Sequence, residues 1–139
     1  MLIVLDTNVL VSGLLKPFGV CGTIVRMVTT FDISICYDTR IVSEYRDVLY
    51  RPKFSFNRNH VSILLDYLEH SGIAVAGLPL KLSLPDRDDD CFLETALAAK
   101  ADYLVTGNIA HFPKHLRCGI AVVNSGEFLE KYREDLNNS

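Results

Sequence analysis

The chain has 139 residues, of which 49% are hydrophobic and 22% are charged. This composition predicts one folded domain with a real core, and it excludes a disordered or fibrous protein. A formal charge of −3 at pH 7 argues against a general nucleic-acid coat protein, which would be basic. No apolar run approaches the roughly 18 residues of a membrane span, and the opening residues carry no basic leader, so we expect a cytoplasmic protein with no membrane segment.

The predicted elements alternate between strands and helices. The first is a continuous apolar run, Leu2-Ile3-Val4-Leu5, which ends at Asp6 and is typical of a central strand covered on both faces. Hydrophobic spacing, capping residues and breakers then predict helix 20–31, strand 33–36, helix 39–50, helix 57–71, strand 73–76, helix 88–100, strand 103–106, strand 120–123 and a final helix after Asn124. The pair Asn124 and Glu127 predicts a capping box at the start of that last helix. Such alternation predicts an α/β protein with an open, mostly parallel sheet and helices on both faces.

The four cysteines are Cys21, Cys36, Cys91 and Cys118, and they form no C-x-x-C pair. Their spacing favours buried reduced thiols over a zinc site or a disulfide framework.

Acidic side chains from three distant segments are expected at one edge of the sheet. Ligands of such sheets bind at the carboxyl ends of the strands, where the strand order reverses. Asp6 ends the first strand, Glu44 lies about one turn into helix 39–50, and the acids of 86–90 precede helix 88–100. Carboxylates packed together repel one another, so a divalent cation is the expected neutralising group, and oxygen ligands favour Mg²⁺ or Mn²⁺.

Each of these residues also has a purely structural interpretation. Asp6-Thr7-Asn8 fits a turn that caps a helix, Glu44 fits a solvated surface charge, and the acids of 86–90 match a helix dipole. Only their convergence on one edge favours the metal site. His111 and His115 lie near the exit of strand 103–106, and the pattern favours no catalytic or ligand role for either.

Several motifs together resemble the PIN-domain family. They are Leu5-Asp6-Thr7-Asn8-Val9-Leu10-Val11-Ser12, the stretch from Glu44 to Phe54, Asp88-Asp89-Asp90-Cys91-Phe92-Leu93-Glu94, and Ala101 to Asn108. Their order and spacing are similar to the branch described as toxin components of prokaryotic toxin–antitoxin systems. The resemblance implies one PIN-like nuclease domain over 1–139, a three-layer α/β/α fold with about five parallel strands in the order 3-2-1-4-5, and metal-dependent cleavage of single-stranded RNA.

The resemblance also implies roles for individual residues. The first acid is Asp6 and the second is Glu44. The third is Asp89 or Asp90, because the two adjacent aspartates allow either register, and of the two we favour Asp89. The family often has a fourth acid where this chain has Asn108, whose amide can still bind a metal-bound water or a phosphate oxygen but adds no charge. Residues that would orient the first acid or bind near the phosphate are Thr7, Asn8 and Ser12.

Basic and aromatic residues after Glu44 are candidates for binding RNA. The densest basic stretch holds Arg46, Arg51, Lys53 and Arg58 beside Phe54 and Phe56, which could stack on bases. A second group is Lys114, His115 and Arg117. The alternative is scattered surface charges with both phenylalanines in the core.

The resemblance further implies a homodimer and a small antitoxin partner. The competing hypothesis is a catalytically weakened PIN-like module that binds RNA or acts as a regulatory partner. The sequence feature that supports it is Asn108, which stands where the family often has a fourth acid. A nucleotide-binding protein is disfavoured, since no glycine-rich loop follows the first strand.

Overall fold

The computed structural model describes residues 1–138, and within them a five-stranded parallel sheet runs through the centre in the order β3-β2-β1-β4-β5. The predicted strand order is therefore confirmed. On the central strand, Ile3, Val4 and Leu5 are buried, because helices cover both faces of the sheet. The strands are β1 (Leu2–Leu5), β2 (Ser34–Tyr37), β3 (Ile73–Ala74), β4 (Tyr103–Val105) and β5 (Val122–Val123).

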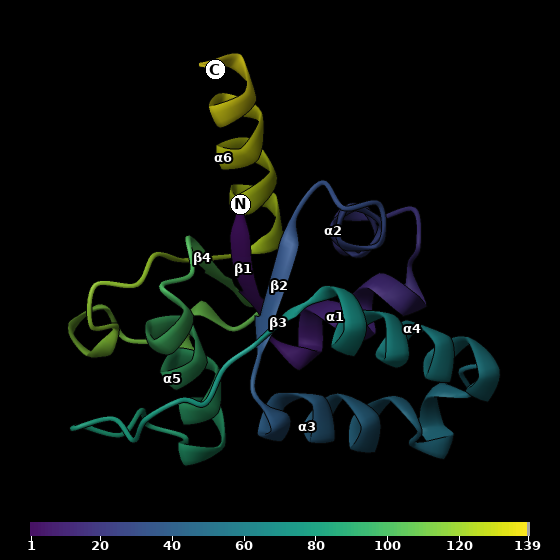
Figure 1. Cartoon of the computed structure of the whole chain (residues 1–139), viewed down its shortest axis with the longest axis horizontal. Coiled ribbons are helices and arrows are strands. Elements are labelled where there is room, and N and C mark those ends of the chain that lie inside the picture. The colour runs from purple at the N-terminus through teal and green to yellow at the C-terminus, as the bar shows by residue number, and fades with distance from the viewer. Residues whose placement is uncertain (139) are drawn as a thin grey trace.

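Helices cover the sheet on two sides and make the fold a three-layer α/β/α sandwich. Figure 1 shows α5 on one side of the strands and α1, α2 and α4 on the other. Helix α3 contacts both α4 and α5, so it connects the two outer layers at one end of the sheet. The helices are α1 (Thr7–Leu15), α2 (Val20–Thr29), α3 (Thr39–Leu49), α4 (Arg58–Ser71), α5 (Asp90–Ala99) and α6 (Ser125–Asn137).

The strand order reverses beside β1. This strand pairs in parallel with β2 on one side, where Ile3 faces Ile35, and with β4 on the other, where Val4 faces Leu104. The two chains that leave β1 and β4 at their carboxyl ends therefore depart next to each other, at the lower end of the sheet in Figure 1. In sheets of this type, that point is where ligands bind.

Helix α1 is the main element that the sequence pattern missed. Residues 7–15 follow the first strand directly, with Val9 and Leu10 buried against the core. The helix is nine residues long, which is too short for a clear periodicity to stand out beside the apolar strand before it. The acids of 86–90 also differ from prediction, because Arg87–Asp89 forms a 3-10 turn and α5 begins at Asp90.

The edge strands are shorter than predicted. Strands β3 and β5 each span two residues, since an edge strand pairs with a neighbour on one side only. At the end of the chain, the predicted capping box is confirmed, with the Glu127 N–H donating to Asn124 Oδ1 at 2.8 Å and the Asn124 N–H donating to Glu127 Oε1 at 3.1 Å. Tyr103 of β4 packs edge to face on Phe128 of α6 at a centroid distance of 5.7 Å.

The cysteines are free thiols, but they are not all buried. Cys36 is buried and Cys21 and Cys91 are partly buried, whereas Cys118 is exposed. The prediction of four buried thiols is wrong for Cys118, because it lies in a surface turn where it and Gly119 adopt φ values of 54° and 87°.

No single helix within residues 1–138 is long and apolar enough to cross a membrane. Helices α1 and α2 satisfy the length and composition test only as a pair, and the chain bends by 102° between them.

Candidate active site

Asp6 lies at the carboxyl end of β1 and is buried, with 6% of its surface exposed. Thr106, which follows β4, donates a hydrogen bond from Oγ1 to Asp6 Oδ2 at 2.7 Å. Burial raises the pKa of Asp6 above its ordinary value, while the hydrogen bond from Thr106 and the backbone groups of Thr7 and Asn8 act in the opposite direction. The Asp6 carboxylate therefore lies between the carboxyl ends of β1 and β4, where burial disfavours its ionised form.

Glu44 lies in α3 and points to the same end of the sheet. The Thr7 hydroxyl donates a hydrogen bond to Glu44 Oε2, which connects the start of α1 to α3. Burial raises the pKa of Glu44, the Thr7 hydrogen bond lowers it, and the nearby charges of Asp6 and Asp88 raise it further. The structure therefore brings the first two predicted acids together.

Asp89 completes a cluster of three carboxylates with Asp6 and Glu44, which we call the acid cluster. Its side chain is 14% exposed and lies 3.1 Å from Nδ1 of His111. Burial and the charge of Asp6 raise the pKa of Asp89 to about 6, against the opposing effect of His111. Because His111 lies in the turn that follows β4, its contact with Asp89 places the third segment at the same edge of the sheet.

Asp90 has different partners, although it is the next residue. Its Oδ2 accepts a hydrogen bond from Ser83 Oγ at 2.7 Å, and its Oδ1 accepts one from the Leu84 N–H at 2.8 Å. Both oxygens thus hold the β3–α5 connection to the start of α5. Of the two residues that the sequence left open, the geometry favours Asp89 as the member of the acid cluster.

The residues predicted to support the first acid lie at the start of α1. Asn8 Oδ1 accepts a hydrogen bond from the Gly107 N–H at 3.0 Å, and Asn8 Nδ2 donates to Asp6 Oδ2 at 3.5 Å. Asn8 therefore joins the exit of β1 to the exit of β4. Ser12 lies one helical turn beyond Asn8 and is exposed.

Asn108 lies at the exit of β4, at the same end of the sheet as Asp6. Its backbone N–H donates to Thr106 Oγ1 at 3.0 Å, and the residue is exposed. Thr106 therefore receives a hydrogen bond from Asn108 and donates one to Asp6, so this segment orients the first acid through a hydroxyl. The amide side chain adds no charge at this position.

Three residues contact acids at or beside this site without a role assigned from the sequence: Thr106, His111 and Arg40. Arg40 Nη1 donates to Glu94 Oε1 at 2.7 Å and its Nε donates to Asp38 at 2.9 Å. Glu94 is buried, and it also accepts a hydrogen bond from the Leu80 N–H at 3.2 Å. Arg40 therefore neutralises two acids that lie outside the acid cluster, and no spacing in the sequence indicates this pairing.

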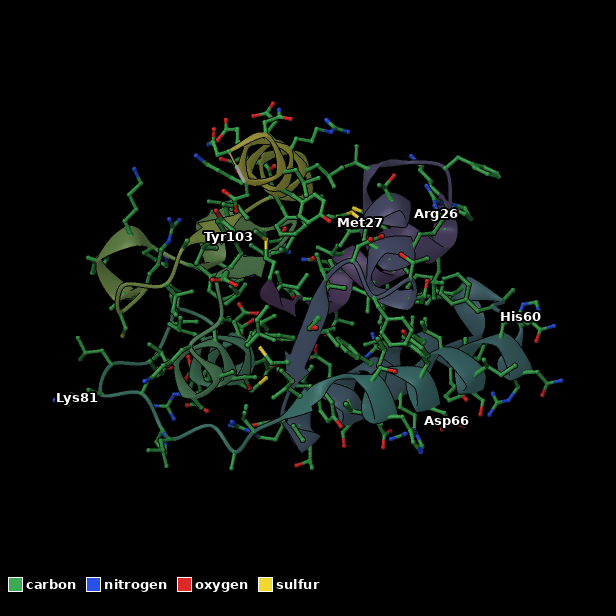
Figure 2. The ribbon with its side chains drawn as sticks, turned by 45° about the horizontal axis from the view of Figure 1, so that its top comes forward. Arg26, Met27, His60, Asp66, Lys81 and Tyr103 are labelled. Carbon is green, nitrogen blue, oxygen red and sulfur yellow. The ribbon has the colours of Figure 1, made fainter. Side chains whose placement is uncertain are left out.

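A hollow of about 360 Å³ opens beside Glu44. Its lining residues are Arg40, Glu44, Arg87, Asp88, Asp90, Cys91 and Glu94. A larger cavity of about 420 Å³ lies away from the acid cluster, between the β3–α5 connection, α5 and Leu116, and its walls are mainly apolar. In Figure 2, Lys81 of this connection extends outward from the body of the molecule. The polar hollow, rather than the larger apolar one, adjoins the acid cluster.

The donor chemistry of the acid cluster fits a hard divalent cation. Its groups are carboxylate oxygens, the ligands that Mg²⁺ and Mn²⁺ prefer. Burial raises the pKa of the neighbouring Cys91 thiol to about 12, so near neutrality it is not the thiolate that zinc sites use. Within residues 1–138, no three His, Cys, Asp or Glu side chains already stand in an arrangement that could hold a metal ion.

The predicted basic and aromatic stretch lies mostly on the surface. Phe54 and Phe56 are partly exposed and stack on each other, with centroids 5.4 Å apart and planes at 12°. Neither ring is fully buried, although Phe56 packs against the edge of the core, so the alternative that placed both rings in the core holds in part for Phe56. Lys53 Nζ lies 5.0 Å from the centre of the Phe54 ring. Arg51 Nη2 pairs with Asp47 at 3.0 Å, and Arg51 also lowers the pKa of Glu44.

Fold and site together define a three-layer α/β/α protein whose acidic side chains gather at the switch point of a parallel sheet. A family model described as PIN domain matches residues 2–110, and the chain belongs to this family, whose members are generally nucleases. The predicted family is therefore confirmed.

A solved structure shares the fold. The chain is similar to a crystal structure of VapBC2 from Rickettsia felis bound to a DNA fragment from their promoter, with a TM-score of 0.58 and 16% identity over 89% of this chain and 98% of that chain. At this identity the likeness concerns the fold. A search of curated proteins gives no match.

Proposed function

We propose that this chain is a Mg²⁺- or Mn²⁺-dependent endoribonuclease that cleaves single-stranded RNA. The observation that carries the proposal is the acid cluster, in which Asp6 lies close enough to Glu44 and to Asp89 for its charge to raise the pKa of both. Such mutual repulsion is costly to the fold. A bound divalent cation would remove that cost and provide a reason for the arrangement.

Asp6, Glu44 and Asp89 are the residues that would hold the cation. When bound, a divalent cation polarises a phosphate and lowers the pKa of a water molecule. The chain's own contribution is orientation, because Thr106 and Thr7 donate hydrogen bonds to Asp6 and Glu44 and so fix one oxygen of each. Asn108 would present its amide to a phosphate oxygen or a bound water at the exit of β4.

The end of α3 and the residues after it would hold the RNA. Arg51 lies near Glu44, and Lys53 follows it with the stacked pair of Phe54 and Phe56. Basic groups contact the phosphates of single strands, while exposed aromatic faces stack on bases. RNA bound there would reach the acid cluster along α3.

The physiological role that we propose is the toxin of a toxin–antitoxin pair in the cytoplasm. The motif resemblance and the fold shared with VapBC2 support this role and a small antitoxin partner. The homodimer is part of the same proposal. A short neighbouring gene that encodes a DNA-binding protein, and whose product suppresses growth arrest on co-expression, would support the toxin role.

Replacing Asp6 with Asn tests the enzymatic proposal. The variant should lose Mn²⁺-dependent cleavage of unstructured RNA while its far-UV circular dichroism stays unchanged, because the amide keeps the shape and the Thr106 contact but removes the charge. Asp32→Asn is the matched control, since Asp32 is exposed in the loop before β2, at the opposite end of the sheet. Unchanged cleavage by Asp6→Asn would refute the assignment. Wild-type protein that binds RNA without cleaving it would favour the non-catalytic module instead.

A further inference from the structure

We infer that His111 is a positioning residue, which holds the Asp89 carboxylate toward Asp6 through a hydrogen bond from Nδ1. The inference rests on the proposed function, because its purpose is to orient a carboxylate for a divalent cation. It assigns a role to a side chain that the sequence pattern left without one.

The contact joins two segments that are far apart in the chain. His111 ends the 3-10 turn Ile109–His111 after β4, and Asp89 ends the turn Arg87–Asp89 before α5. Their Nδ1 and Oδ2 atoms lie 3.1 Å apart.

The backbone after β4 places the imidazole. Thr106, at the start of this segment, donates to Asp6, and Asn108 accepts the His111 N–H with its carbonyl oxygen at 2.9 Å. The segment 106–111 therefore supplies a hydrogen-bond donor to Asp6 from the Thr106 hydroxyl and another to Asp89 from Nδ1 of His111. Where the family often has another acid, at Asn108, this chain has a neutral residue that shapes the turn leading to His111.

The chemistry of the ring suits this role. A neutral imidazole with its proton on Nδ1 donates to a carboxylate without adding positive charge, so the contact is compatible with a cation bound to the same carboxylate. Carboxylates that bind metals are usually hydrogen-bonded on their other side, and loss of such a partner typically weakens metal affinity about 10–100-fold. The His111 side chain is half-exposed, at 47%.

Two substitutions separate the Nδ1 donor from the bulk of the ring. His111→Asn places an amide N–H near the position of Nδ1, whereas His111→Phe keeps a ring without a donor. His115→Phe is the matched control, because His115 lies against the apolar cavity rather than the acid cluster. Thermal unfolding of all three variants should resemble that of the wild type, since His111 and His115 are exposed.

Calorimetry with Mn²⁺ and steady-state cleavage kinetics provide the test. We expect His111→Phe to weaken Mn²⁺ binding about 10-fold or more and to lower kcat with little change in KM for RNA, and His111→Asn to restore most of the loss. Wild-type Mn²⁺ affinity in His111→Phe would overturn the inference, as would equal losses in the Phe and Asn variants. If the wild type itself binds no Mn²⁺, the proposed function fails first, and the inference fails with it.

Discussion

Replacement of Asp89 by Asn should stabilise the protein, and the gain should depend on pH. In the folded chain, the pKa of Asp89 is raised from 3.8 to about 6 by burial and by the charge of Asp6. This difference corresponds to about 3 kcal/mol at ~1.4 kcal/mol per tenfold change in proton affinity. Contact with solvent screens part of it, so we expect about 2 kcal/mol for the ionised form.

The sign follows from proton binding. Between pH 3.8 and about 6, the folded chain holds a proton on Asp89 that the unfolded chain has already released, so the free energy of unfolding falls as the pH rises. Above pH 6 both states are ionised and the full cost persists. The stability advantage of Asp89→Asn should therefore be absent below pH 3.8, grow up to about pH 6, and stay constant at higher pH.

Urea unfolding followed by far-UV circular dichroism measures this advantage. A gain of about 2 kcal/mol shifts the midpoint by about 1 M urea if the slope is unchanged. Asp32→Asn serves again as the control and should show no shift. Added Mn²⁺ should stabilise the wild type and not Asp89→Asn, because ligand binding to the folded state alone raises its stability. Equal stability of Asp89→Asn and wild type at neutral pH, or a gain that does not shrink in acid, would refute the repulsion that we describe.

Two further predictions concern neighbouring residues. Asp90→Ala should lower the free energy of unfolding by about 1–3 kcal/mol, because the Ser83 and Leu84 donors lose their acceptor. Calorimetry should show unchanged Mn²⁺ affinity in this variant. A large loss of affinity would mean that Asp90, too, is a ligand of the cation. Joint replacement of Arg51 and Lys53 by Gln, in the Asp6→Asn background, should reduce the slope of log affinity for single-stranded RNA against log salt by about 1.4. Fluorescence polarisation measures that slope, Lys131→Gln on α6 is the control, and an unchanged slope would place the RNA elsewhere.

Much of the fold was predictable because its causes are local in the chain. A continuous β-branched run such as residues 2–5 suits a strand covered on both faces, and the box of Asn124 and Glu127 defines the start of α6 through contacts three residues apart. The alternation of such elements limits the topology, since parallel neighbours need long crossovers. Helix α1 escaped prediction, because nine residues beside an apolar strand carry too little periodicity.

The sequence by itself determined the order of the parallel strands and the PIN-domain family, and it predicted that acids from three segments meet at the carboxyl edge of the sheet. Only the tertiary structure distinguished Asp89 from Asp90. Residues next to each other at a helix start point in directions about 100° apart, so each carboxylate contacts a different segment that is distant in the sequence. Asp90 meets the β3–α5 connection, while Asp89 meets Asp6 and His111. The role of His111 was hidden for the same reason: its partner lies 22 residues away in the chain, and no local pattern encodes a contact between the turn after β4 and the turn before α5.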